Sequence, residues 1–173
     1  MDRRQISSLL VLKDLGIDAS MKSFRDRLVV QKLIYLAQAA GLDLGYYYGW
    51  YIRGPYCSAV ADDMFAAFVD PSGIDDAYKN WSLGPKSKKS LRSVGSLLKK
   101  EGFNLNADTD DGNLARRLEL LASVHYLIDR KQVTHDGPRA ITKKLKACNK
   151  NFSEQEVTQA VKELRQARLV PSK

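Results

Sequence analysis

The sequence predicts a mainly α-helical fold, a compact bundle of six to seven helices with a C-terminal lobe that resembles a winged helix or helix-turn-helix. Apolar residues recur every three or four positions in successive segments, which is the period of an amphipathic helix. Serine, proline and glycine stand where those segments begin and end, as they do at helix boundaries. Only one short aromatic stretch reads as extended chain, so we expect little strand.

Two helices are predicted at the start of the chain. Residues 3–16 carry leucines at near-helical spacing, and Gly16 ends the segment. Ser23 and Asp26 form the pattern of a capping box, and the apolar stripe that follows them continues to Gly41. This second helix is expected to be the central helix of the core.

The segment from Gly45 to Tyr56, GYYYGWYIRGPY, holds six of the fifteen aromatic residues of the chain. Its glycines follow one another too closely for a stable helix interior, and Pro55 restricts the residues before it to extended or turn geometry. The sequence therefore predicts an irregular or short β-like segment between two core helices.

Two further helices follow the aromatic segment. Ser58 is a suitable N-cap for the third, which Pro71 stops. Pro85 suits the first position of the fourth, which is expected to run to about Glu101 before Gly102. Its leucines and valine lie on one side and its lysines cover much of the remainder.

The polar stretch 104–113 is the most linker-like part of the chain. We therefore expect two lobes, a helical one over residues 1–105 and a helix-turn-helix-like one over residues 106–173.

Three helices are predicted in the second lobe. A strongly periodic helix runs from residue 114 to about Asp129. Gly137 and Pro138 open a short helix, and a capping box of Ser153 and Glu156 opens the last.

Composition indicates an ordinary globular protein, with 44% hydrophobic and 28% charged residues. No apolar run approaches the roughly 20 residues of a membrane span, so we expect a soluble, cytoplasmic protein with no membrane contact. Cys57 and Cys148 lie 91 positions apart with no CxxC pattern. Buried free thiols are expected, without a disulfide or a zinc site.

Charge is distributed unevenly along the chain. Residues 1–85 carry 9 basic and 10 acidic side chains, whereas residues 86–173 carry 19 basic and 10 acidic ones. A basic half suggests an acidic partner, and either a solvated surface or contact with a DNA or RNA backbone would explain it. Acidic residues at the start of the last helix argue against sequence-specific readout. The candidate nucleic-acid-binding residues are Lys86, Lys88, Lys89, Arg92, Arg139, Lys143, Lys144, Lys146 and Lys150.

Catalytic motifs are missing from the sequence: it has no phosphate loop, dinucleotide fingerprint, HExxH or GxSxG pattern. We therefore expect no enzyme, catalytic residue, metal or cofactor. His125 is expected to be a packed imidazole on an amphipathic helix, and His135 beside Asp136 is the best remaining base, with no nucleophile nearby. The pair Asp62 and Asp63 is explained by the dipole of the third helix.

The aromatic segment suits a packed or adhesive role better than base stacking, because Arg53 is its only basic residue and its flanks are acidic. Its rings bury area, and its hydroxyl groups and Arg53 supply polar anchors. The candidate partner-binding residues are Tyr46, Tyr47, Trp50, Arg53 and Tyr56.

The run RLVVQKLIYLAQAAGLDLGYYYGWYIRGPYCSAVADDM, residues 27–64, resembles the Panacea-type family of antitoxin-like proteins, in particular its YwgA-like branch. Cys57 stands in place of the usual serine and Ser58 in place of the usual proline. LLASVHYL and FSEQEVTQAVKELRQARLV are similar to the closing helices of the family. The residues that match the pattern are Gln31, Lys32, Leu33, Tyr35, Trp50, Gly54, Pro55, Tyr56 and Asp63.

This resemblance implies an α-rich fold with no catalytic role that acts by binding another protein. The expected function is a non-enzymatic subunit that holds or restrains an effector encoded nearby, a toxin or a nuclease/ATPase assembly, in antiphage defence or a toxin–antitoxin system. The alternative is a winged-helix-like, DNA-associated accessory subunit or regulator in an ATPase (SMC-like) defence complex, with non-specific contacts to the DNA backbone.

Overall fold

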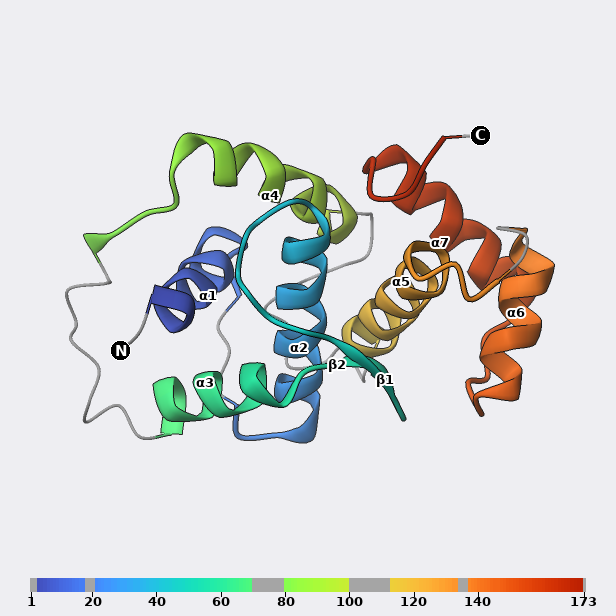
Figure 1. Ribbon diagram of the computed structural model, residues 1–173, viewed down its shortest axis with the longest axis horizontal. Coiled ribbons are helices and arrows are strands. Elements are labelled where there is room, and N and C mark those ends of the chain that lie inside the picture. The colour runs from blue at the N-terminus through green and yellow to red at the C-terminus, as the bar shows by residue number, and fades with distance from the viewer. Residues whose placement is uncertain (1–2, 18–20, 70–79, 100–112, 134–136, 173) are drawn as a thin grey trace.

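A computed structural model describes residues 3–17, 21–69, 80–99, 113–133 and 137–172 (Figure 1). These residues form seven helices and a single two-stranded sheet, so the mainly helical fold is confirmed. In chain order the elements are α1 (Arg3–Asp14), α2 (Phe24–Ala39), β1 (Gly49–Tyr51), β2 (Gly54–Tyr56), α3 (Ser58–Val69), α4 (Pro85–Leu98), α5 (Asn113–Asp129), α6 (Pro138–Ala147) and α7 (Glu154–Gln166).

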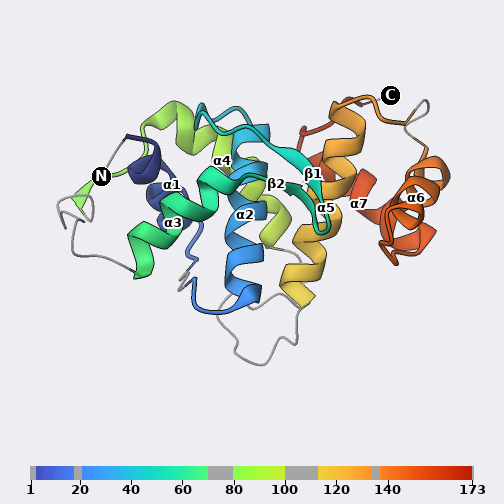
Figure 2. The ribbon, with the colours of Figure 1, turned by 60° about the horizontal axis from the view of Figure 1, so that its bottom comes forward.

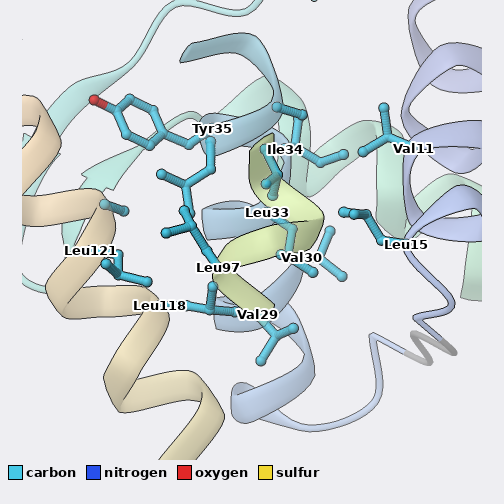
Figure 3. Close-up of a cluster of buried hydrophobic side chains, with 14 of the residues drawn as sticks. Val11, Leu15, Val29, Val30, Leu33, Ile34, Tyr35, Leu97, Leu118 and Leu121 are labelled. Carbon is cyan, nitrogen blue, oxygen red and sulfur yellow. The ribbon is translucent and has the colours of Figure 1, made fainter. Parts of the chain in front are cut away.

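Helix α2 is the centre of the molecule, as predicted. Helices α1, α3 and α4 lie on one side of it and α5 on the other, with α7 and then α6 beyond α5 (Figures 1 and 2). Every residue of α2 from Val29 to Ala37 is buried. In the core, Leu118 and Leu121 of α5 approach α2 from one side and Val11 of α1 from the other (Figure 3). A helix that is buried on all faces suits this central position.

Both predicted capping boxes are present. The Asp26 amide donates to Ser23 Oγ at 3.0 Å, and the Ser23 amide donates to Asp26 Oδ2 at 3.2 Å. At α7 the Glu156 amide donates to Ser153 Oγ at 3.1 Å, and the Ser153 amide donates to Glu156 Oε2 at 2.8 Å. Reciprocal bonds of this kind satisfy amide groups that have no partner within the helix.

Prolines open α4 and α6, as their positions in the sequence predict. Helix α4 ends at Leu98, three residues earlier than predicted, with Lys99 as its C-cap. The predicted linker, 104–113, and the boundary at 105/106 lie almost entirely outside the described residues. Helix α5 packs against both α2 and α7, so it joins the two halves of the helical body.

An extended segment follows α2, and its side chains alternate between inside and outside. Leu42, Leu44, Tyr46 and Tyr48 are buried, whereas residues 43, 45 and 47 are exposed. This is the alternation of a half-buried strand. Here the backbone of Tyr46 binds a side chain of α2 instead of a neighbouring strand.

Two glutamines of α2 bind the backbone of this segment and of the chain after β2. Gln38 Nε2 donates to the Tyr46 carbonyl at 2.7 Å, and its Oε1 accepts from the Tyr46 amide at 3.0 Å. Gln31 binds Cys57 in the same way, at 2.7 Å to the carbonyl and 3.2 Å from the amide. Each side-chain amide thus supplies the donor and the acceptor that a neighbouring strand would supply in a sheet.

The aromatic segment then forms a short antiparallel hairpin, which confirms the prediction of a short β-like stretch. Gly49 pairs with Tyr56, and Tyr51 pairs with Gly54. Strand β2 packs on α5 as well as α2, so the hairpin is wedged between the two central helices (Figure 2).

The predicted helix pair of the C-terminal lobe is present as α6 and α7, which pack on each other. Residues 167–170 form turns and bends, and no strand follows α7 as far as residue 172. The winged-helix-like character of this lobe stays a prediction. Cys57 and Cys148 are both free; Cys57 is buried as expected, whereas Cys148 is partly exposed. No helix in the described ranges has the length and apolarity to cross a membrane.

Candidate functional site

The five predicted partner-binding residues do not form one surface. Tyr47 is 92% exposed, and Arg53 and Tyr56 are also exposed, but Trp50 is half-buried and Tyr46 is only 3% exposed. The placement of Tyr46 in a contact surface is therefore wrong, because period-two alternation turns it into the core.

Tyr46 is held by a polar cluster between α1 and α3. Its hydroxyl donates to Asp63 Oδ2 at 2.9 Å and lies 3.1 Å from Ser8 Oγ. Arg4 Nε donates to the same carboxylate oxygen at 2.8 Å, and its guanidinium lies 5.0 Å from the centre of the Tyr46 ring. Burial raises the pKa of the Tyr46 hydroxyl well above its usual range.

This cluster corrects the interpretation of the acidic pair. Asp62 and Asp63 lie beyond the first turn of α3, which contains no acidic residue, so the helix dipole does not explain them. Asp62 is exposed, and Asp63 is buried as the link between Arg4 and Tyr46.

Apolar side chains are exposed together around the hairpin. Ile52, at its tip, is 73% exposed, and Tyr51, Tyr56 and Phe24 at the start of α2 are also exposed. Single exposed apolar side chains are common, but a contiguous group marks an interaction site.

Two hollows flank the tip of the hairpin. The first, of about 460 Å³, lies between the start of α2 and the hairpin. The second, of about 520 Å³, lies between the tip, α5 and the loop that follows α6. Phe24, Leu28, Ile52 and Arg53 line both hollows, which therefore meet at the tip and together form the hairpin groove.

Two buried lysines donate hydrogen bonds to backbone carbonyls of the hairpin. Lys32 is 1% exposed, and its Nζ donates to the Pro55 carbonyl at 2.6 Å. Desolvation lowers the pKa of Lys32 to about 7, although the nearby Glu119 carboxylate favours the charged form. Lys150 Nζ donates to Glu119 Oε1 at 2.6 Å and to the Ile52 carbonyl at 2.8 Å. Two lysine side chains thus bind the carbonyl groups at both ends of the hairpin turn.

Lys150 consequently leaves the predicted nucleic-acid-binding set. It is 4% exposed and its ammonium group is bound inside the protein, 5.6 Å from the centre of the Trp50 ring. Arg53 extends the network outward, with a nitrogen 3.4 Å from Glu119 Oε2. Burying the Lys150 charge is tolerable because a carboxylate and a carbonyl pair with it.

The other predicted basic residues lie in two separate places. Helix α6 is at one end of the molecule, whereas α4 lies beside α1 and α2 (Figure 1). Lys88 is partly exposed, with its Nζ 4.0 Å from Asp14 Oδ1. The exposed members are Lys86, Lys89, Arg92, Arg139, Lys143, Lys144 and Lys146.

His125 is a packed imidazole, as predicted. Its Nε2 donates to the Leu169 carbonyl at 3.1 Å, and its Nδ1 lies 2.7 Å from the Tyr35 hydroxyl. A carbonyl only accepts, so Nε2 carries the proton and Nδ1 accepts from Tyr35. Burial lowers the pKa of His125, which favours this neutral form. His135 and Asp136 lie outside the described residues.

Sequence reasoning missed Phe24, Ile52 and Glu119. Two of them carried a signal: Phe24 follows the N-cap directly, outside the apolar stripe of α2, and Ile52 is an aliphatic residue at a hairpin tip, where polar residues are usual. Glu119 had none, because its role depends on chain segments that meet only in the folded protein.

Within the described ranges, no group of three or more histidine, cysteine, aspartate or glutamate side chains is arranged to hold a metal ion. No family model, curated protein or solved structure matches the chain.

Proposed function

We propose that the protein is a non-enzymatic binding subunit and that it holds a partner protein in the hairpin groove. The observation that carries this proposal is the convergence of four exposed apolar side chains, Phe24, Tyr51, Ile52 and Tyr56, on one hollowed surface. Aromatic and aliphatic anchors beside a pocket are the usual centre of a protein–protein contact.

The rigidity of the groove supports this role. Gln31, Lys32 and Lys150 bind the backbone of the hairpin and of the residue after it at 2.6–2.8 Å. A surface already held in place loses less conformational entropy when a partner binds. The buried polar groups therefore serve to position the apolar ones.

The class of partner rests on the resemblance of residues 27–64 to the Panacea-type proteins. On that basis the partner is an effector encoded nearby, either a toxin or a nuclease/ATPase assembly of bacterial antiphage defence, and the subunit restrains it. Gln31, Lys32, Gly54 and Pro55, which match the family pattern, all lie in or against the hairpin.

Co-expression with the products of adjacent genes tests this proposal. One product is expected to co-purify with the full-length chain, and Ile52→Asp is expected to weaken that complex by more than about thirtyfold, the loss typical of a central anchor. Phe65→Asp is the matched control, because Phe65 is also exposed but lies on α3 outside the groove lining. Capture that is equally strong with Ile52→Asp, or that fails only with Phe65→Asp, contradicts the proposal.

A second function is favoured by one observation on α6. Its four basic side chains are exposed and the helix contains no acidic residue, so it suits contact with phosphates in a winged-helix-like, DNA-associated accessory subunit of an ATPase (SMC-like) complex. The four residues are Arg139, Lys143, Lys144 and Lys146.

A salt titration of duplex DNA binding tests the second function. Changing Lys143, Lys144 and Lys146 to glutamate is expected to reduce the slope of log affinity against log salt by about 0.9 for each phosphate that the variant no longer neutralises. The control variant changes Lys13, Lys22 and Lys131 to glutamate, which gives the same change in net charge on other parts of the chain. An unchanged slope in the α6 variant rejects the idea.

A further inference from the structure

Given the proposed protein-binding role of the hairpin groove, on which this step rests, we infer that the groove binds a partner segment carrying both apolar and acidic side chains. The evidence is the charge around the groove, which is strongly one-sided. Among the described residues, the lining contains one carboxylate, that of Glu119, and six basic residues: Arg25, Arg27, Lys32, Arg53, Arg116 and Lys150.

The Glu119 carboxylate already has partners within the protein. Glu119 Oε1 accepts from Lys150 at 2.6 Å, and Oε2 accepts from Arg53 at 3.4 Å. Glu119 is buried, whereas the Arg53 side chain is 58% exposed. The guanidinium of Arg53 therefore reaches the groove surface with further N–H groups directed to solvent.

Other arginines add positive charge along the rim. Arg25 is partly exposed and makes no hydrogen bond or ion pair with the described residues. Arg116 is compensated, because it donates to Glu156 Oε1 at 2.7 Å and to the Asn151 carbonyl at 3.1 Å. Arg25 and Arg53, which line the second hollow together with Ile52, are thus the rim cations most available to a partner carboxylate.

The apolar part of the groove favours a protein segment over a nucleic acid. Bases bind chiefly by stacking on open aromatic faces. The Tyr51 and Tyr56 rings lie against each other with centroids 5.4 Å apart, and the most exposed apolar side chain of the tip is the aliphatic Ile52. Each hollow has the size of a small ligand pocket, so apolar partner side chains fit on either side of Ile52 while acidic neighbours reach the arginines.

A display selection of random short peptides on the full-length protein tests this inference. Enriched peptides are expected to combine aspartate or glutamate with leucine or aromatic residues, and to lose binding to the Ile52→Asp variant but not to the Phe65→Asp variant. Arg25→Glu is expected to weaken the best peptide by about twofold to fivefold, the range of a single exposed ion pair. Lys86→Glu, which makes the same charge change on α4, is expected to leave its affinity unchanged.

The possible results separate this inference from the proposed function. Enriched peptides that need Ile52 but are neutral or basic overturn the acidic partner and leave the protein-binding groove standing. The absence of any peptide that depends on Ile52 overturns both. Oligothymidylate that binds the wild type and loses binding with Ile52→Asp overturns both in favour of a single-stranded nucleic acid.

Discussion

Gly54 lies directly against Ser123, where β2 packs on α5. A Cβ atom on Gly54 would stand 2.3 Å from Ser123 Oγ, and the Gly54 φ of +81° is one that other residues rarely adopt. Ser123 Oγ is itself buried and finds no hydrogen-bond partner in the part of the chain described. Any side chain at position 54 would therefore have to displace the Ser123 hydroxyl for β2 to lie this close to α5.

Gly54→Ala is expected to lower the free energy of unfolding by about 2–4 kcal/mol, from left-handed backbone strain and from overpacking against α5. Adding Ser123→Ala removes the Oγ and is expected to recover the overpacking part, leaving about 1–2 kcal/mol of backbone strain. Urea denaturation of the two single variants and the double variant measures both parts.

Gly49 provides the control for that experiment. It lies in the same hairpin, and a Cβ added there meets nothing within 4 Å. Gly49→Ala is expected to change the free energy of unfolding by less than about 1 kcal/mol. If Gly49→Ala costs as much as Gly54→Ala, close packing on Ser123 is not the reason for glycine at position 54.

Asp63→Ala is expected to lower the free energy of unfolding by about 2–3 kcal/mol, because it leaves the buried Tyr46 hydroxyl and the Arg4 guanidinium without their shared acceptor. The neighbouring Asp62 is exposed, and Asp62→Ala is expected to stay within about 0.5 kcal/mol of the wild type. Thermal and urea unfolding distinguish the two. If both variants lost the same free energy of unfolding, the contacts of Asp63 with Tyr46 and Arg4 would not be its main contribution, and a role shared with Asp62, such as interaction with the helix dipole, would be favoured.

Local features of the fold were predictable from the sequence because their signals are local. The capping boxes of α2 and α7 and the prolines of α4 and α6 lie within a few residues of the helix ends that they define. The burial of Tyr46 and Tyr48 but not Tyr47 was also encoded, since Leu42, Leu44 and Tyr46 alternate with Asp43 and Gly45, and the same period of two continues to position 48.

The groove could not be predicted because its parts are brought together from distant positions. Lys150 and Ile52 are 98 positions apart, and Lys32 and Pro55 are 23 apart. In the sequence Lys150 looks like its neighbour Lys146, yet only Lys150 meets Glu119 and leaves the surface. Which lysine is buried depends on helix packing, and a single sequence does not contain that information.

Gln31→Leu is expected to lower the free energy of unfolding by about 2–3 kcal/mol, because the Cys57 amide and carbonyl then lose their buried partners. Hydrogen exchange gives a local reading of the same effect, with the Cys57 amide losing protection. The Tyr46 amide, bound by Gln38 instead, is the internal control and is expected to keep its protection. Equal loss of protection at both amides would show that the variant unfolds generally, and would contradict a local effect of Gln31 on Cys57.

Lys32 is expected to make stability depend on pH. Its pKa is lowered from 10.5 to about 7 in the folded protein, so between these values the unfolded chain binds a proton that the native state does not. Stability from this group therefore rises with pH from about 7 toward 10.5, by at most about 1.4 kcal/mol per pH unit, and is constant below 7. Above pH about 10 the buried tyrosines, whose pKa values are raised, act in the opposite direction, because their hydroxyls ionise first in the unfolded chain.

Lys32→Met isolates the contribution of this one amine, because every other titrating group is common to both proteins. Urea unfolding of the wild type and the variant is compared across pH 7 to about 10, the window set by the lowered lysine pKa and the tyrosines. The stability of the variant relative to the wild type is expected to be highest near pH 7 and to fall as pH rises. A difference that stays flat across the window would mean that Lys32 keeps its proton in the fold, and that the Pro55 carbonyl and the Glu119 carboxylate compensate for its burial.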